Sequence, residues 1–381
     1  MKNKIVVIIC SLIIQFAVNL PVSAEDIEIY VTDEDTSVQS NVLLLIDTSG
    51  SMDSTVEVDD TYGDSYTITD FHTPTEACIT YEQVCSGRRC TNECTETGKV
   101  LTRMEIVQDV ASDLIETTND INISLMRFDS DSEGGYVDLA SQDIANVKAT
   151  FQTTVNSYNA DGYTPLEESY YEVYRYFSGQ TPEYGNASSP STSDSDALSG
   201  GTYIPPITDS CQKNNVILFT DGQPTRDTSS NTDIQGLVSG LLPDDSDLDD
   251  DCSGDGECLD ELAYYLSNTD LDDDLDGDQT ISTYTIGGFG LDGDAVSLLE
   301  NVAKYGGGAY HSADDADGLG SALESIIQDI LSEDSTFAAP SVSVSAFNSL
   351  QNSDELYYAL FKPGDGARWH GNLKRYRINE N

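Results

Sequence analysis

Short runs of apolar residues alternate along the chain with longer segments in which apolar residues recur every three or four positions. The runs are typical of buried strands and cover residues 42–46, 121–128, 216–222 and 282–286. Shorter strands are expected at 136–139, at the sheet edge, and at 309–312. The periodic segments predict helices at 103–116, 144–155, 165–177, 258–267, 295–304 and 319–331. Strands that alternate with helices predict an α/β fold, with a doubly wound, mostly parallel sheet flanked by helices.

Three stretches interrupt this alternation, near residues 53–99, 178–215 and 227–280. The first is polar and rich in cysteine, and it is far longer than an ordinary connection of about 4–6 residues. We expect it to be an irregular insertion. The second is rich in Ser, Gly and Pro. The third contains sixteen acidic residues between positions 244 and 278.

The two ends of the chain differ in character from the middle. Lys2 and Lys4 precede an apolar run at 5–18, which is followed by Val22-Ser23-Ala24. This is the pattern of a secretory signal peptide at 1–24, so we expect an exported protein. Its run is short for a membrane span, and no later stretch is long and apolar enough for one.

The C-terminal part has the character of β structure. Strands are expected at 342–347, 356–361 and 369–378, with no helix between them. Three short strands are unsuited to burying a core alone. We therefore expect one large domain over 25–336, and over 337–381 the start of a truncated β-rich domain.

Seven of the eight cysteines follow the expected cleavage point, and export favours disulfides. We expect Cys252 to pair with Cys258. Most of the group Cys78, Cys85, Cys90 and Cys94 should be oxidised, in a pairing that the sequence leaves open. The seven include Cys211, and because the count is odd, one cysteine is either free or paired outside this segment. The spacing fits no common zinc pattern.

The charge balance is strongly acidic, with 17 basic and 68 acidic residues and a net charge of −51. Such a field repels nucleic acid and anionic membranes, and it attracts divalent cations and basic partners. Solubility in an extracellular or salty medium explains the same balance equally well.

Oxygen-bearing side chains gather where the first apolar run ends. Asp47, Ser49 and Ser51 occupy alternate positions on a turn that Gly50 allows to bend sharply. A carboxylate and two hydroxyls suit Mg²⁺, which takes about six oxygen ligands and keeps several of them as water. Thr164 stands in a loop before a helix, and Asp221 ends another buried strand. Ligands of doubly wound sheets bind at the carboxyl ends of strands, where both aspartates lie.

These residues together resemble the metal-ion-dependent adhesion site of von Willebrand factor A domains. The family pattern of Asp-x-Ser-x-Ser, a loop Thr and a strand-end Asp corresponds in order to Asp47, Ser49, Ser51, Thr164 and Asp221. The resemblance implies that the two serines and Thr164 coordinate a cation directly or nearly so. It implies that the two aspartates act directly or through water. The cation would be Mg²⁺, or Mn²⁺ or Ca²⁺, with one position open for a ligand carboxylate.

The C-terminal stretch 369–376, WHGNLKRY, adds a second resemblance. With the leader, the adhesion motif and the cysteine-rich insertion, it resembles the N-terminal part of the PilY/PilC family of type IV pilus tip-associated biogenesis proteins and adhesins. The similarity covers essentially the whole chain after the leader. It implies minor pilins or other tip components as partners, or a host or surface ligand that offers a carboxylate. It also implies a place at the pilus tip, cell surface or outer membrane, and a fragment of a longer protein with a β-propeller.

The acidic stretch contains half of another cation motif. Asp272, Asp274, Asp276 and Asp278 lie in a run that matches the first half of an EF-hand calcium loop, with Gly277 at its sixth position. The twelfth position is Thr283, so the bidentate Glu is missing. A partial Ca²⁺ loop and a solvated acidic loop are both compatible with this run.

The sequence shows no catalytic motif. The chain has only three histidines, His72, His311 and His370, and no nucleophile motif, zinc-protease motif or phosphate loop. We expect a binding module and not an enzyme. The alternative to a pilus module is a secreted metal-dependent binding protein or adhesin unrelated to pili.

Overall fold

The computed structural model describes most of the chain from residue 38 to residue 377. The described residues are 38–68, 71–86, 89–129, 133–186, 192–210, 212–243, 246, 248–249, 251–334, 337–342, 355–362 and 370–377. The leader expected at 1–24 and Cys211 lie outside them.

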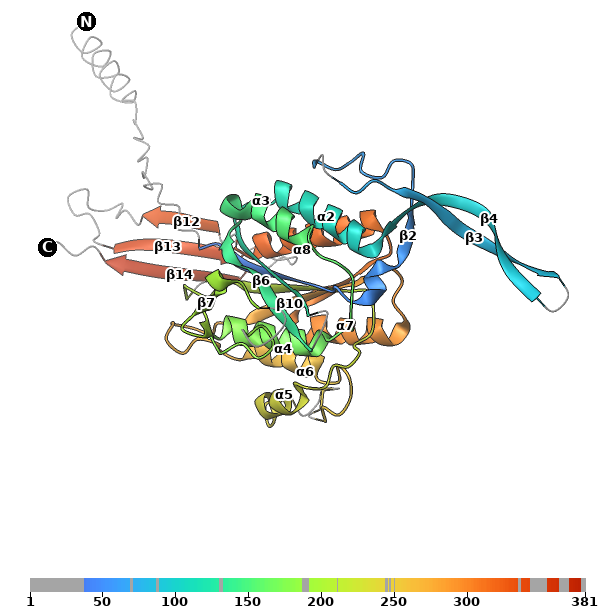
Figure 1. Ribbon diagram of the computed structural model, residues 1–381. Helices are drawn as coiled ribbons and strands as arrows, with labels where there is room; N and C mark the ends of the chain where they lie inside the picture. The colour runs from blue at the N-terminus through green and yellow to red at the C-terminus, as the bar shows by residue number, and fades with distance from the viewer. Residues whose placement is uncertain are drawn as a thin grey trace, which may run out of the picture. The chain divides into compact units, whose positions relative to one another are not determined.

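A six-stranded sheet forms the centre of the fold, in the order β11-β10-β9-β1-β5-β6. Its strands pair in parallel except for the edge strand β6, which is antiparallel to β5 (Figure 1). The predicted α/β class with a mostly parallel sheet is therefore confirmed. The strands are β1 (Ser40–Ile46), β5 (Ile121–Phe128), β6 (Gly135–Asp143), β9 (Asn214–Thr220), β10 (Ile281–Gly288) and β11 (Gly307–Ala313).

The two central strands are apolar because both of their faces are covered. All seven residues of β1 are buried, and so are all seven of β9. Val42, Leu44 and Ile46 pack into one hydrophobic cluster, and Leu43 and Leu45 pack into the other, as the alternation of side chains along a strand requires.

Helices supply the rest of each cluster and cover the two faces of the sheet (Figure 1). One layer consists of α2 (Arg103–Thr117), α3 (Ile144–Val155) and α8 (Ala316–Asp334). The other consists of α4 (Leu166–Phe177), α5 (Asn231–Val238), α6 (Leu259–Asn268) and α7 (Gly293–Tyr305). Helix α4 corresponds to the helix predicted at 165–177 and is rich in tyrosine. Its tyrosines are buried, and the Tyr170 hydroxyl lies 2.5 Å from Thr283 Oγ1 inside the protein.

The direction of winding reverses between β1 and β9. From β1 the chain proceeds to β5 and β6 on one side, and then returns to β9 on the other side. The carboxyl ends of these two neighbours are tied together, because the Asp47 N–H donates to the Phe219 carbonyl at 3.0 Å. This is the position at which doubly wound sheets bind ligands.

The first insertion is ordered β structure, so the expectation of an irregular segment at 53–99 is wrong. After the short 3-10 helix η1 (Gly50–Asp53), the strands β2 (Thr55–Val58), β3 (Thr75–Ser86) and β4 (Arg89–Thr102) form an antiparallel sheet in the order β2-β4-β3. The described residues of β3, and those of β4 up to residue 97, are exposed or only partly buried. Their polar composition therefore lacks the apolar alternation that reveals a half-buried strand.

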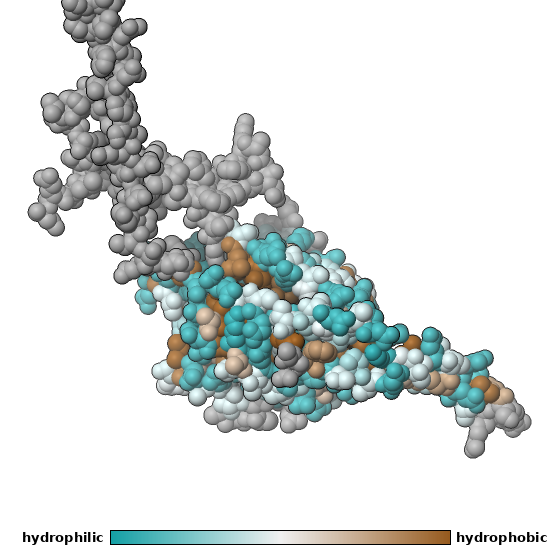
Figure 2. Space-filling view, turned by 90° about the horizontal axis from the view of Figure 1, so that it is seen from above, coloured by the Kyte–Doolittle hydropathy of each residue, from teal (hydrophilic) through white to brown (hydrophobic). Residues whose placement is uncertain are grey.

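Disulfides brace this hairpin and confirm the expected oxidation of its cysteines. Cys78 pairs with Cys94, and Cys85 pairs with Cys90. Figure 2 shows a largely hydrophilic surface with a few hydrophobic residues near the far end of the hairpin. Tyr81 of β3 is 61% exposed.

The other insertions add small elements. The second contains η2 (Ser195–Ala197) and the paired strands β7 (Leu198–Ser199) and β8 (Thr202–Tyr203). The third contains α5, which the sequence pattern did not reveal, and α6. The expected disulfide between Cys252 and Cys258 is present at the start of α6.

Three antiparallel strands follow α8, namely β12 (Phe337–Val342), β13 (Glu355–Lys362) and β14 (His370–Arg377). The last two correspond to the strands predicted at 356–361 and 369–378. Most of the strand predicted at 342–347 lies outside the described residues. That these strands begin a further domain stays a prediction. None of the helices in the described part of the chain is long and apolar enough to cross a membrane.

Candidate metal-binding site

Asp47 is buried and directly follows the central strand β1. Its side chain accepts two hydrogen bonds, from the Ser49 N–H to Oδ1 at 2.7 Å and from Thr220 Oγ1 to Oδ2 at 2.6 Å. Asp47 is fully buried. The turn after β1 and the end of β9 therefore fix the carboxylate from two sides.

The two serines and Asp221 continue this arrangement across the ends of β1 and β9. Ser49 Oγ lies 2.8 Å from Ser51 Oγ, and Ser51 Oγ donates to Asp221 Oδ1 at 2.5 Å. Four of the five residues predicted from the sequence are thus joined by hydrogen bonds, although Asp221 lies 170 positions after Ser51.

Thr164 approaches the same place through its loop. The Gly50 N–H donates to the Gly162 carbonyl at 3.2 Å. The Thr164 N–H donates to Thr225 Oγ1 at 3.0 Å, and the Thr164 carbonyl accepts from the Thr225 N–H at 3.0 Å. Gly162 has a φ of +81°, which a glycine adopts without a Cβ penalty. Within the five predicted residues, all of which the structure describes, Thr164 alone shares no hydrogen bond with the others.

Negative charge is concentrated in this site. Burial, and after it the neighbouring Asp221 carboxylate, raise the pKa of Asp47 to about 6. A cation placed between two such groups would remove the repulsion. The donors are carboxylate and hydroxyl oxygens, which fit a hard divalent cation such as Mg²⁺. The described part of the chain contains no group of three or more His, Cys, Asp or Glu side chains that could hold a metal ion. A cation at this site would therefore depend on the hydroxyls and on water as well as on the two carboxylates.

Two residues of the site were not identified from the sequence. Thr220, which fixes Asp47, lies inside the strand pattern and carries no motif. Arg103 donates through a terminal nitrogen to Asp221 Oδ2 at 2.5 Å, and its guanidinium carbon lies 5.5 Å from the centre of the Phe289 ring. Arg103 is the first residue of α2, directly after the first insertion. Only the folded insertion brings it to the site, so no spacing rule reveals it.

The acidic loop is arranged differently. The Asp274 N–H donates to Asp272 Oδ1 at 3.0 Å, and the Gln279 N–H donates to Asp270 Oδ1 at 3.0 Å. These side chains therefore stabilise the turn itself. A calcium ion held by Asp272, Asp274, Asp276 and Asp278 stays a prediction.

A second group of buried acids lies at the start of α4. Asp227 accepts the N–H groups of Glu167 at 2.6 Å and Glu168 at 2.9 Å, so it caps the helix from a distant loop. Glu167 Oε2 accepts from the Cys258 N–H at 2.8 Å, whereas Oε1 has no partner among the described residues. Burial raises the pKa of both Glu167 and Asp227 to about 8. These carboxyl groups are largely protonated at neutral pH.

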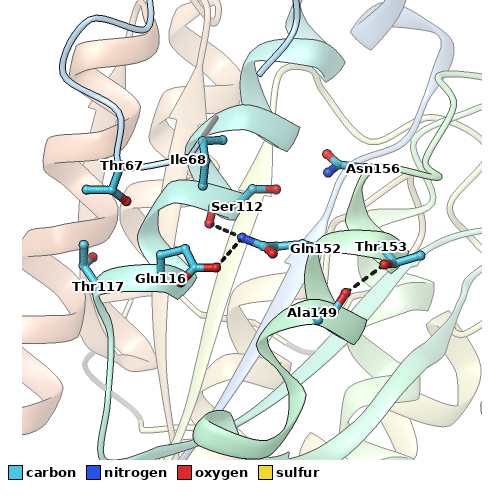
Figure 3. A pocket seen from close by; sticks show the side chains of 9 residues that line it. All are labelled: Thr67, Ile68, Ser112, Glu116, Thr117, Ala149, Gln152, Thr153 and Asn156. Carbon is cyan, nitrogen blue, oxygen red and sulfur yellow. Dashed lines mark hydrogen bonds between the residues drawn. The ribbon is translucent and has the colours of Figure 1, made fainter. Parts of the chain in front are cut away.

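A cavity of about 660 Å³ lies between α2 and α3, away from the metal-binding residues (Figure 3). Its lining is polar. Gln152 Nε2 crosses it to donate to the Ser112 carbonyl at 3.1 Å and to Glu116 Oε1 at 3.0 Å. This arrangement joins the two helices and offers a cation one carboxylate, Glu116.

No protein-family model and no curated protein matches the chain. Among solved structures, it is similar to a von Willebrand factor type A protein from Catenulispora acidiphila, at 12% identity and a TM-score of 0.40 over 90% of this chain and 66% of that one. It is similar to the PilB minor pilin from Streptococcus sanguinis, at 15% identity and a TM-score of 0.41 over 78% of this chain and 63% of that one.

A third similar structure is the vWF domain of the type V pili tip protein Mfa5 from Porphyromonas gingivalis, at 11% identity and a TM-score of 0.36 over 81% of this chain and 99% of that one. All three TM-scores are low. The fold assignment therefore rests on the strand order of this chain.

Proposed function

We propose that the chain is a pilus-associated adhesion module that binds an acidic group of a partner through a divalent cation. The residues that would hold the cation are Asp47, Ser49, Ser51, Thr164 and Asp221. One observation carries the proposal: side chains from the ends of two neighbouring parallel strands form a single hydrogen-bonded group of carboxylates and hydroxyls.

The residues of this group have distinct roles in the proposal. Ser49 and Ser51 offer hydroxyl oxygens on one turn, and Asp47 orients that turn by accepting the Ser49 N–H. Asp221 supplies charge from β9, and Thr225 holds the loop of Thr164 in position. A bound Mg²⁺ or Mn²⁺ supplies a positive centre that a partner's carboxylate can approach.

The charge of the chain restricts the partner. A net charge of −51 repels an acidic surface at long range, so a carboxylate would reach the site only within basic surroundings. We infer a partner with an exposed Asp or Glu inside a basic patch. The resemblance of 369–376 to PilY/PilC proteins supports a pilus component, such as a minor pilin, and the leader supports export to the cell surface.

A binding role is favoured over a catalytic one. The chain has three histidines, and His72 is engaged structurally, with Nδ1 2.7 Å from Asp109 Oδ1. Among the described residues, the hydroxyls of Ser49 and Ser51 bond to each other and to Asp221 and not to an imidazole that could act as a base. Ser51 instead donates to the carboxylate of Asp221.

Calorimetric titration of the exported chain with Mn²⁺ tests the site. We expect Asp47→Ala to abolish binding. Ser51→Ala should weaken it by at least about tenfold, since even indirect partners of a metal cost about 10–100-fold in affinity when removed. Ser54→Ala is the matched control, because it removes the same hydroxyl from an exposed position three residues away. Equal Mn²⁺ affinity in wild type and Asp47→Ala would show that the site is misassigned.

A further inference from the structure

The ion pair between Arg103 and Asp221 lies inside the proposed adhesion site. Both oxygens of Asp221 are engaged, Oδ1 by Ser51 and Oδ2 by Arg103. The Asp221 side chain is fully buried, whereas that of Arg103 is 22% exposed. A cation that uses Asp221 therefore has to share this carboxylate with a guanidinium that already neutralises it.

The first insertion positions Arg103. Strand β4 ends at Thr102, which pairs with Thr55 of β2 and caps α2 by accepting the Glu105 N–H at 3.1 Å. The Arg103 N–H donates to the Ser54 carbonyl at 2.9 Å, and Ser54 lies three residues after Ser51. The two ends of the insertion thus meet beside the same site. The fold therefore fixes the backbone of Arg103 beside the site, and its side chain reaches Asp221 from there.

The ion pair uses only part of the guanidinium. One terminal nitrogen bonds to Asp221, and Nε is buried without a hydrogen-bond partner among the described residues. Arginine binds carboxylates most strongly through two parallel N–H···O bonds. A single contact is therefore weaker than the one that the same side chain could make with a free carboxylate.

We propose that Arg103 is a built-in cation of the adhesion site, which holds Asp221 in the metal-free protein and binds the partner's carboxylate in the metal-bound one. A divalent ion competes with Arg103 for Asp221, because two cations on one carboxylate repel each other at short range. The displaced guanidinium remains at the exposed side of the site, where a carboxylate held by the metal can accept its two parallel N–H groups. This inference rests on the proposed function. It makes Arg103 a residue that determines specificity for an acidic partner.

The first test is Mn²⁺ titration of the wild-type chain, Arg103→Gln and Arg103→Lys. Arg103→Gln should bind Mn²⁺ more tightly, on the order of tenfold, because one competing charge-assisted hydrogen bond is gone. Arg103→Lys keeps the charge and should bind as the wild type does. Lys99→Gln is the matched control: it removes a positive charge from the preceding strand β4, where Lys99 pairs with Asp60 at 2.8 Å, and should leave Mn²⁺ affinity unchanged.

The outcomes separate this inference from the proposed function. Unchanged or weaker Mn²⁺ affinity in Arg103→Gln, with normal binding in the wild type, would overturn competition by Arg103 and leave the metal site standing. Binding by Arg103→Gln alone would support competition. Absence of binding in every variant would overturn both.

The second test uses an immobilised peptide with one glutamate between lysines, at saturating Mn²⁺. We expect chelator-sensitive binding by the wild type, and binding weakened by at least about tenfold in both Arg103→Gln and Arg103→Lys, since lysine cannot make the two-pronged contact. Wild-type peptide binding by both variants would overturn the role of Arg103 as an anchor, as would a wild-type chain that binds Mn²⁺ but not the peptide.

Discussion

Asp47 shows how a single residue links the stability of the fold to the chemistry of the site. The side chain is fully buried beside a second carboxylate, and both effects raise its pKa. Two hydrogen bonds partly compensate for this burial, one from the backbone and one from Thr220. The arrangement is costly for the metal-free fold and favourable for a cation, which is the pattern expected where function and stability conflict.

Thr220 offers a precise way to disturb this arrangement. Thr220→Val keeps the shape of the side chain but removes the donor to Asp47 Oδ2, and it also removes the acceptor of the Gly222 N–H. We expect the free energy of unfolding to fall by about 1–3 kcal/mol, because a buried acceptor is left unsatisfied. Mn²⁺ affinity should fall by about tenfold or more, because Asp47 loses its orientation.

Denaturant unfolding and Mn²⁺ titration of the same preparations check this prediction. Thr285→Val is the control, since Thr285 is a buried threonine of the neighbouring strand β10 that bonds to the Leu299 carbonyl at 2.8 Å. It should lose stability without losing Mn²⁺ affinity. If both variants keep wild-type Mn²⁺ affinity, Thr220 does not position Asp47 for a metal.

Glu167 and Asp227 predict a second measurable effect, on the pH dependence of stability. Their pKa values in the folded chain are raised to about 8, above the ordinary values of 4.5 and 3.8. The folded state therefore binds more protons than the unfolded state between about pH 4 and pH 8. The free energy of unfolding should fall as the pH rises through this window.

Glu167→Gln isolates one part of that effect. Glutamine is neutral at every pH and keeps an acceptor for the Cys258 N–H. We expect it to reduce the loss of stability between pH 5 and pH 8 by at least about 1 kcal/mol, the equivalent of roughly one pKa unit. Urea unfolding at both pH values measures this, with Glu300→Gln on the exposed surface of α7 as the control. A wild-type slope in Glu167→Gln would mean that this carboxyl is ionised in the folded chain at neutral pH.

At the scale of elements, the hairpin and the sheet should respond separately to reduction. The hairpin residues that the structure describes contribute little to the two hydrophobic clusters, so the disulfides Cys78–Cys94 and Cys85–Cys90 brace a ribbon and not the core. Cys258 is fully buried within the core cluster of α6, so its disulfide with Cys252 fixes a core element.

Replacing each pair by serines distinguishes these roles. Cys78→Ser with Cys94→Ser should make the hairpin sensitive to protease while the melting temperature of the sheet stays unchanged. Cys252→Ser with Cys258→Ser should lower that temperature, because removal of a native disulfide from a small domain costs about 2–5 kcal/mol. Limited proteolysis and thermal melting of the two variants decide the matter. A lower melting temperature in the hairpin variant would show that the ribbon supports the core.

The elements that could be predicted from the sequence are those that bury a face. Strand β5 and helix α3 occupy the residues expected for them, because an apolar run or an apolar stripe marks each one. Strands β3 and β4 could not be found in this way, since the described residues of β3, and those of β4 up to residue 97, are exposed or only partly buried. Helix α5 could not be found either, because its eight residues are too few to show a clear helical period.

The same distinction holds for the candidate site. Asp47, Ser49, Ser51 and Asp221 carry a local motif or a strand end, and the structure brings them together. Arg103 reaches the site only because an insertion returns the chain to it, and that closure is a tertiary property. A residue that reaches a site only through the tertiary fold of an insertion has no local sequence pattern that reveals it.

At the scale of the whole molecule, the first insertion and the proposed metal site share one edge of the sheet. The insertion leaves just after Ser51 and returns at Arg103, and the chain around it is strongly acidic. The negative charge of the chain repels acidic surfaces at long range, whereas a cation bound at the site would attract a carboxylate at short range. Together they favour a partner that carries a carboxylate within a basic surface. Attachment through this edge should then depend on divalent cations and weaken when a chelator removes them.

A strain that carries Ser51→Ala in the chromosomal gene tests whether this edge is used in the cell. We expect fewer surface pili or weaker attachment at a normal level of exported protein, because the substitution removes a hydroxyl of the site and leaves the core strands intact. Ser54→Ala, in the same turn, should behave as the wild type. Pull-down of minor pilins with the two proteins would show whether the loss concerns a pilus partner or another surface ligand. Normal pilus number and attachment in the Ser51→Ala strain would show that the proposed metal site is not needed for this function. The basic segment beyond Phe337, which includes Lys374 and Arg375, would then be the next region to mutate.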